Sequence, residues 1–143
     1  MKLLECHVDN CGKLSNFDYQ LSDGLTAIQE PNGFGKSTLA AFIKAMLYGF
    51  PRTAGRNIAS NERKKYIPWQ GGTYGGSLDF EFEGVNYRVW RIFGKTAAKD
   101  RFSLRDLTNR RESNRFTEKL GEELFQLDAE SFMRSVYMPQ MQN

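Results

Sequence analysis

The sequence has few of the residues that build disulfide scaffolds, metal centres or membrane spans. Its 143 residues include two cysteines, one histidine and four prolines. Cys6 and Cys11 lie near no cluster of cysteine or histidine, so they are expected to be reduced packing residues. The apolar runs are far shorter than the roughly 20 residues that cross a bilayer, and the start of the chain lacks the apolar core of a signal peptide. These absences favour a cytoplasmic protein without a membrane partner.

The composition is that of a folded domain. Hydrophobic residues make up 40% of the chain, charged residues 26% and aromatic residues 13%, among them eleven phenylalanines. This balance excludes disorder of the whole chain. The length allows one domain or part of a larger one.

The net charge of +3 is unevenly distributed. Residues 1–50 carry a slight negative excess, whereas residues 88–115 hold nine basic residues against three acidic ones. A smaller basic group lies within 52–65. Basic stretches of this kind are typical of solvated strand faces, and some of them bind nucleic acid. We therefore regard 88–115 and 52–65 as candidate DNA-facing surfaces.

The first 50 residues predict short strands followed by one strong helix. Alternating apolar residues predict strands at 3–8, 17–21 and 25–29, and at least two of them must pair antiparallel because the turns between them are short. Apolar residues then follow the helical period on one face: Leu39, Phe42, Ile43, Met46, Leu47 and Phe50. Gly49 and Pro51 predict the end of this helix.

The remainder predicts an antiparallel meander followed by helices. Residues 52–76 have no regular period and are expected to form a flexible basic loop. The later segments are strands at 78–82, 85–89 and 102–107, a loop at 94–100, and a helix carrying Phe116, Leu120, Leu124 and Leu127. Asp128 is expected to cap a second helix that reaches Val136. No internal repeat occurs.

One segment has the pattern of a phosphate-binding loop. It follows a predicted strand and opens the strong helix, which is the context that such a loop requires. The candidate cofactor-binding residues are Asn32, Gly33, Phe34, Gly35, Lys36, Ser37 and Thr38. The glycines allow backbone N–H groups to point inward, and the lysine reaches the β- and γ-phosphates of a nucleotide. The Ser37 hydroxyl is suited to Mg²⁺, and the pattern therefore predicts ATP and Mg²⁺ as cofactors.

The segment departs from the full pattern at its first position. Counting back from Gly35 places Glu30 where the pattern has glycine. A carboxylate beside a triphosphate is unfavourable unless it points away, so the effect of Glu30 is left open.

The chain resembles the amino-terminal head of SMC-like ABC ATPases, the class of RecF, RecN and SbcC. In residues 1–50 the resemblance rests on the Gly12-Lys13 turn, the strand at 24–28 and the phosphate loop. Further along, Tyr48-Gly49, the 65–69 segment, the meander and Arg91 resemble a bacterial subgroup. Residues 131–140 are similar to the approach to the family's Q-loop, which falls at 138–143.

The resemblance implies an α/β fold, the N-lobe of a P-loop NTPase with an antiparallel meander. Gln140 would be the Q-loop glutamine that helps to hold Mg²⁺ and the attacking water, with Gln142 as an alternative. An arginine that senses nucleotide or DNA is expected among Arg52, Arg56 and Arg63. The implied partners are a C-terminal lobe of the same protein, a second head that sandwiches the nucleotides, and DNA.

Several elements of a complete head are missing from 1–143. There is no apolar strand ending in adjacent acids, no Leu-Ser-Gly-Gly signature and no switch histidine, and His7 lies in the first strand. The chain therefore resembles a single N-terminal lobe that does not hydrolyse ATP by itself. The alternatives are an ABC transport ATPase, a small-molecule kinase with a P-loop, and a non-enzymatic nucleotide-binding scaffold.

Overall fold

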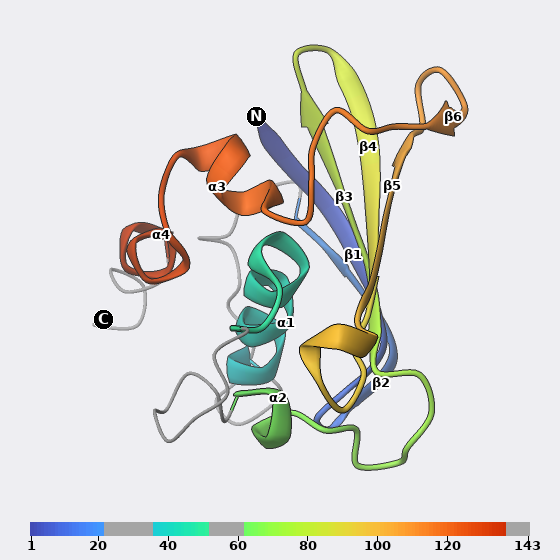
Figure 1. Cartoon of the computed structure of the whole chain (residues 1–143), viewed down its shortest axis with the longest axis vertical. Helices are drawn as coiled ribbons and strands as arrows, with labels where there is room; N and C mark the ends of the chain where they lie inside the picture. Colours follow the sequence, from blue (N-terminus) through green and yellow to red (C-terminus); the bar gives the residue numbers. More distant parts are fainter. Residues whose placement is uncertain (22–35, 52–61, 137–143) are drawn as a thin grey trace.

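The computed structural model describes residues 1–21, 36–51 and 62–136 (Figure 1). The strands are β1 (Lys2–Cys11), β2 (Leu14–Gln20), β3 (Gly75–Phe82), β4 (Val85–Ile92), β5 (Arg101–Asp106) and β6 (Arg111–Glu112). The helices are α1 (Lys36–Tyr48), α2 (Glu62–Lys65), the 3₁₀ helix η3 (Ala97–Lys99), α3 (Leu120–Phe125) and α4 (Ala129–Val136).

The strands form one sheet in the order β2-β1-β3-β4-β5-β6. Every neighbouring pair is antiparallel, as the short turns of the sequence predicted. The expected meander is therefore confirmed and is joined to the amino-terminal hairpin through β1 and β3. The strand predicted at 25–29 lies outside the described residues.

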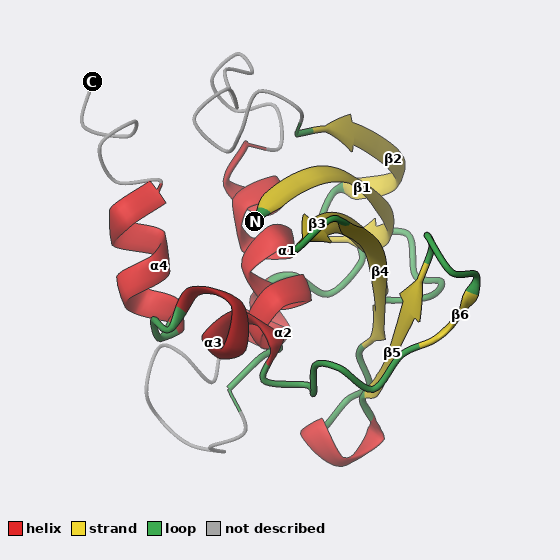
Figure 2. Cartoon of the chain, turned by 90° about the horizontal axis from the view of Figure 1, so that it is seen from above, coloured by secondary structure: helices red, strands yellow, loops and turns green. Residues whose placement is uncertain are grey.

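The two faces of this sheet differ because side chains alternate along each strand. On the inner face, Leu78, Phe80 and Val89 are fully buried. Helix α1 packs on this face against β1, β3 and β4, and α3 and α4 pack against α1. Figures 1 and 2 show all three helices on one side of the sheet. Within the described part of the chain, no helix covers the outer face.

Helix α1 forms where the apolar period predicted it. Phe42, Ile43, Met46 and Leu47 are almost completely buried, so one continuous apolar face lies on the sheet. The helix ends at Tyr48. The next residue, Gly49, has a left-handed φ of 73°, and its N–H donates to the carbonyl of Ala45 over 2.7 Å. A left-handed glycine is a common helix terminator because it lacks a Cβ.

The helix predicted from Phe116 to Leu127 is shorter than expected. Phe116 precedes α3 and packs edge-on against the rings of Phe80, Phe82 and Tyr87, so its burial reflects an aromatic cluster rather than a helical face. The helix ends at Phe125, and the next residue, Gln126, has a left-handed φ of 57°.

The predicted cap of the last helix is present. Asp128 accepts a hydrogen bond from the Ser131 N–H over 2.8 Å, which is the contact of an N-cap carboxylate with the first turn. Hydrogen bonds from this turn lower the pKa of the Asp128 carboxyl.

Two stretches expected to be irregular contain regular structure. The described part of 52–76 holds α2 and the first two residues of β3, and the loop at 94–100 holds η3. Among the described helices, none is both long and apolar enough to cross a membrane.

Candidate functional site

The amino end of α1 is the described part of the predicted phosphate site. Lys36 is the first residue of this helix, as the motif required. Ser37 is exposed, and Thr38 is buried with 9% of its surface accessible. Asn32, Gly33, Phe34 and Gly35 lie outside the described residues, as do Gln140 and Gln142. The structure therefore locates the start of the helix but not the loop that precedes it.

The turn between β1 and β2 lies against Thr38. Gly12, in this turn, has a left-handed φ of 55°. A Cβ at this position would lie 3.1 Å from Cγ2 of Thr38 and 3.6 Å from the ring of Tyr66. Glycine is thus required both by its conformation and by this close approach. The Gly12-Lys13 turn, noted in the sequence only as part of a resemblance, is packed on the first turn of α1.

The 66–69 segment is held to the same turn by two backbone hydrogen bonds. The Gly12 N–H donates to the carbonyl of Tyr66 over 2.7 Å, and the Trp69 N–H donates to the carbonyl of Gly12 over 2.9 Å. The Lys65 ammonium lies 5.4 Å from the centre of the Tyr66 ring. The Trp69 side chain is 76% exposed. Sequence reasoning did not bring this segment to the start of α1, because the contacts join residues more than fifty positions apart.

Helix α2 is tied to α1 by an ion pair. Lys44 Nζ lies 2.6 Å from Oε1 of Glu62, and both side chains are about four-fifths buried, with 18% and 20% of their surfaces exposed. A charged pair with so little solvent around it is screened less than a surface pair. It therefore fixes α2 and the following 66–69 segment beside the helix of the candidate site.

The described residues at this end fit a bound nucleotide and Mg²⁺. The first turn of α1 carries no acidic side chain. The N–H groups at the start of a helix and its dipole favour an anion such as a phosphate. The Ser37 hydroxyl is an oxygen ligand of the kind that Mg²⁺ binds. When bound, Mg²⁺ would neutralise phosphate charge, and the described residues that would contribute are Ser37 and the first turn of α1.

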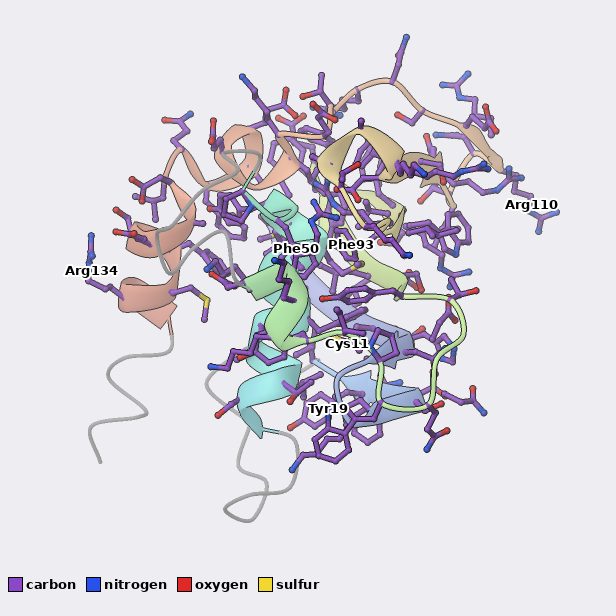
Figure 3. All side chains as sticks on the ribbon, turned by 60° about the horizontal axis from the view of Figure 1, so that its bottom comes forward. Cys11, Tyr19, Phe50, Phe93, Arg110 and Arg134 are labelled. Atoms are coloured by element: carbon purple, nitrogen blue, oxygen red, sulfur yellow. The ribbon has the colours of Figure 1, made fainter. Side chains whose placement is uncertain are left out.

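The candidate sensor Arg63 is committed to the fold. Its guanidinium makes two hydrogen bonds to the carboxylate of Asp100, over 2.7 and 2.8 Å, and a third to the carbonyl of Gly94. It also lies 5.4 Å from the centre of the Phe50 ring, which packs on Phe93 (Figure 3). Arg63 therefore braces α2 against the 94–100 loop. Arg52 and Arg56 lie outside the described residues.

Arg91 is an internal residue. It is 6% exposed and donates hydrogen bonds to three backbone carbonyls, those of Met46, Leu47 and Glu118. Burial lowers the pKa of its guanidinium to about 10, so the group remains charged at neutral pH. Within the basic stretch at 88–115, this arginine is a structural element rather than a surface cation.

Two further cations of that stretch also have side-chain partners. Arg88 makes two hydrogen bonds to the carboxylate of Asp79, which is 5% exposed, and Arg115 pairs with Glu83 and Tyr87. The side chains of the other six basic residues of 88–115 form no hydrogen bond or ion pair with another described residue. They are Lys95, Lys99, Arg101, Arg105, Arg110 and Arg111.

Comparison with known proteins gives a family and one relative. The family model described as "AAA domain" matches residues 5–143. The uncharacterized protein YhaN of Bacillus subtilis (strain 168) is 38% identical over 94 residues. That match covers 64% of this chain and 8% of YhaN, so the chain spans a small part of this relative's length.

Proposed function

The chain belongs to the AAA domain family, and on this basis we propose that it is the ATP- and Mg²⁺-binding lobe of an SMC-like ATPase that acts on DNA. A C-terminal lobe and a second head would complete the hydrolytic site. Gln140 would help to hold Mg²⁺ and the attacking water, and residues 32–38 would hold the phosphates.

The observation that carries this proposal is the start of α1. The helix begins at Lys36, directly after the glycines of the motif, and presents an exposed Ser37 in a first turn without acids. The turn at Gly12 lies against Thr38 and is held by two backbone hydrogen bonds to the 66–69 segment. A helix start packed against a turn that is itself held by backbone hydrogen bonds suits a site whose groups must stay in place when an anion binds.

The antiparallel sheet bears on the alternatives. A small-molecule kinase with a P-loop requires parallel strands alternating with helices after the first helix. In the described residues every strand pair is antiparallel, and β3 to β6 follow one another without an α-helix between them. This topology disfavours the kinase and supports a head lobe.

The experiment that tests the proposal measures binding of a fluorescent ATP analogue to the chain. Wild type is expected to bind it in the presence of Mg²⁺, and Lys36→Ala to lose binding. Ser37→Ala is expected to weaken binding in Mg²⁺ but not in EDTA, because its hydroxyl is assigned to the metal. Lys64→Ala, an exposed lysine on α2, is the matched control and should bind as wild type does.

Two outcomes would contradict the proposal. Equal binding by wild type and Lys36→Ala would show that the phosphates are not bound at Lys36. Phosphate release by the chain alone, abolished in Lys36→Ala, would contradict the requirement for a second lobe.

A further inference from the structure

The outer face of β4 and β5 carries a tryptophan framed by arginines. Residues directly opposite one another in an antiparallel pair point to the same side of the sheet. The outward positions pair as Arg88 with Arg105, Trp90 with Ser103 and Ile92 with Arg101. Trp90 is 37% exposed and Ile92 is 42% exposed, although their neighbour Val89 on the other face is fully buried. Two large apolar side chains therefore face outward among three guanidinium groups.

Trp90 lies between Ser77 of β3 and Ser103 of β5, and Arg88 lies over its ring. The guanidinium of Arg88 lies 5.6 Å from the centre of its ring, and Arg88 is itself fixed by two hydrogen bonds to Asp79. Across the strands, the residue opposite Trp90 is the small Ser103, which is itself exposed. The indole is thus an oriented and accessible ring, as a stacking platform must be.

Most of the exposed charge along this edge of the sheet is positive, although Glu112 of β6 lies opposite Arg105. Arg101 and Arg105 lie on β5, Lys95 and Lys99 lie before it, and Arg110 and Arg111 follow it. A six-residue strand is about 20 Å long, so these cations are spread along the strand and are not gathered at one position. Figure 3 shows Arg110 on the opposite side of the molecule from Arg134 of α4.

Several acids on the other half of the outer face have partners within the chain, whereas Glu81 of β3 is exposed and lies opposite Asn86. Asp79 accepts two hydrogen bonds from Arg88, and Asp18 accepts one from His7. Glu5 accepts one from Gln20 over 2.7 Å. The carboxylates of Asp79, Asp18 and Glu5 are thus satisfied, whereas the side chains of Arg101 and Arg105 have no partner among the described residues. The available charge on β5 is therefore positive and favours a polyanion.

We propose that the outer face of β4 and β5 binds single-stranded DNA, with one base stacked on Trp90 and phosphates bound by Arg101 and Arg105. In a duplex the bases are already stacked on one another, so an exposed indole would gain no base contact. A single strand presents free base faces, and proteins that bind single strands combine aromatic platforms with a cationic track. The site deepens the proposed function, because it rests on the proposed action on DNA, but it is independent of ATP binding.

The test compares two tryptophans in the same chain. Binding of a short labelled oligodeoxythymidylate and of a duplex is measured by fluorescence anisotropy. Trp90→Leu is expected to weaken single-strand binding on the order of tenfold, the loss typical of one stacked base, without changing duplex binding. Trp90→Phe should restore most of the affinity because it keeps an aromatic face. Trp69→Leu removes the other exposed tryptophan and should bind as wild type does.

The charge contribution is tested by salt dependence. The double variant Arg101→Gln, Arg105→Gln is expected to reduce the slope of log K against log salt by about 1.4, as two lost phosphate contacts on a single strand require. Arg134→Gln with Lys119→Gln removes the same charge from exposed positions on and before the helices and should leave the slope unchanged. Circular dichroism melting of each variant identifies any loss of folding.

The outcomes separate this site from the proposed function. Unchanged single-strand binding in folded Trp90→Leu, or an equal loss for single strand and duplex, would overturn the stacking site. Absence of DNA binding together with dimer formation that depends on Arg101 and Arg105 would assign the face to a second copy instead. Binding of the ATP analogue is measured on the same variants, so either proposal can fail while the other stands.

Discussion

Arg91 closes the carboxyl end of α1 by donating from its Nε to the carbonyl oxygen of Met46 over 2.8 Å. The last carbonyls of a helix have no partner within the helix, and a buried helix end must find them elsewhere. Here a strand residue supplies the donors and also reaches the carbonyl of Glu118 ahead of α3. One guanidinium therefore joins the sheet, the helix of the candidate nucleotide site and the α3 segment.

Replacing Arg91 is expected to destabilise the fold. Arg91→Met keeps much of the volume but leaves three carbonyls without their donor, which should lower the free energy of unfolding by about 3 kcal/mol. Urea unfolding followed by circular dichroism measures this. Arg134→Met, at an exposed position on α4, should change it by less than about 0.5 kcal/mol. A loss as small as that of the control would show that solvent satisfies these carbonyls.

Gly12→Ala is expected to weaken nucleotide binding as well as stability. The alanine would have to adopt the left-handed φ of 55° that Gly12 has, and its Cβ would lie 3.1 Å from Cγ2 of Thr38. Gly71→Ala is the matched control, because Gly71 also has a positive φ, of 74°, but has no atom within 4 Å of the added Cβ. Both variants should lose about 1 kcal/mol to backbone strain. Binding of the fluorescent ATP analogue should fall only in Gly12→Ala. An equal effect of both variants would show that the contact between the turn and Thr38 does not influence nucleotide binding.

The two thiols should be unreactive in the folded chain and should make its stability sensitive to alkaline pH. Burial raises the pKa of Cys6 to about 12 and that of Cys11 to about 12, from an ordinary value of 9.0. Below pH 9.0 both thiols are protonated whether the chain is folded or unfolded, and their contribution is fully present. As the pH rises from there towards 12, unfolding releases protons, and each thiol should cost about 1.4 kcal/mol of stability per pH unit.

The thiol effect is measured against a double variant. Cys6→Ala with Cys11→Ala removes both groups, so the difference in pH dependence between it and wild type isolates them. A thiol reagent at pH 8 should modify wild type only at the rate of unfolding. Rapid modification of the native chain would contradict the burial of these residues.

Asp79→Asn is expected to strengthen single-strand binding. In wild type the Asp79 carboxylate neutralises the Arg88 guanidinium beside Trp90. The uncharged asparagine of the variant would leave that guanidinium available for a phosphate. The slope of log K against log salt should become steeper by about 0.7, one additional phosphate contact. Glu81→Gln removes one charge from a neighbouring exposed position of β3 and should have a smaller effect, since Glu81 lies opposite Asn86 rather than an arginine. Weaker binding in Asp79→Asn would show that Arg88 acts by orienting Trp90.

Local features of the fold were predictable from neighbouring residues. The apolar period predicted α1 and its end at Gly49, alternation predicted β3 and β4, and Asp128 predicted a cap. The helix expected from Phe116 was wrong in extent because a buried aromatic gives the same signal whether it lies on a helix or packs across a sheet. The role of Arg91 was not predictable, since nothing local separates a buried arginine from an exposed one in a strand.

The amino-acid sequence by itself determined the phosphate-loop pattern, the helix that follows it and the antiparallel course of the later strands, because each depends on residues close together in the chain. Tertiary structure alone decided which cations are engaged by partners and which are left available. Nine basic residues lie in 88–115, yet Arg88, Arg91 and Arg115 are engaged by partners that other strands and helices bring to them. Pairing of β4 with β5 then places Arg101 and Arg105 on the same face as Trp90. Charge is a property of composition, but its availability depends on contacts between distant segments, and only the folded chain specifies those.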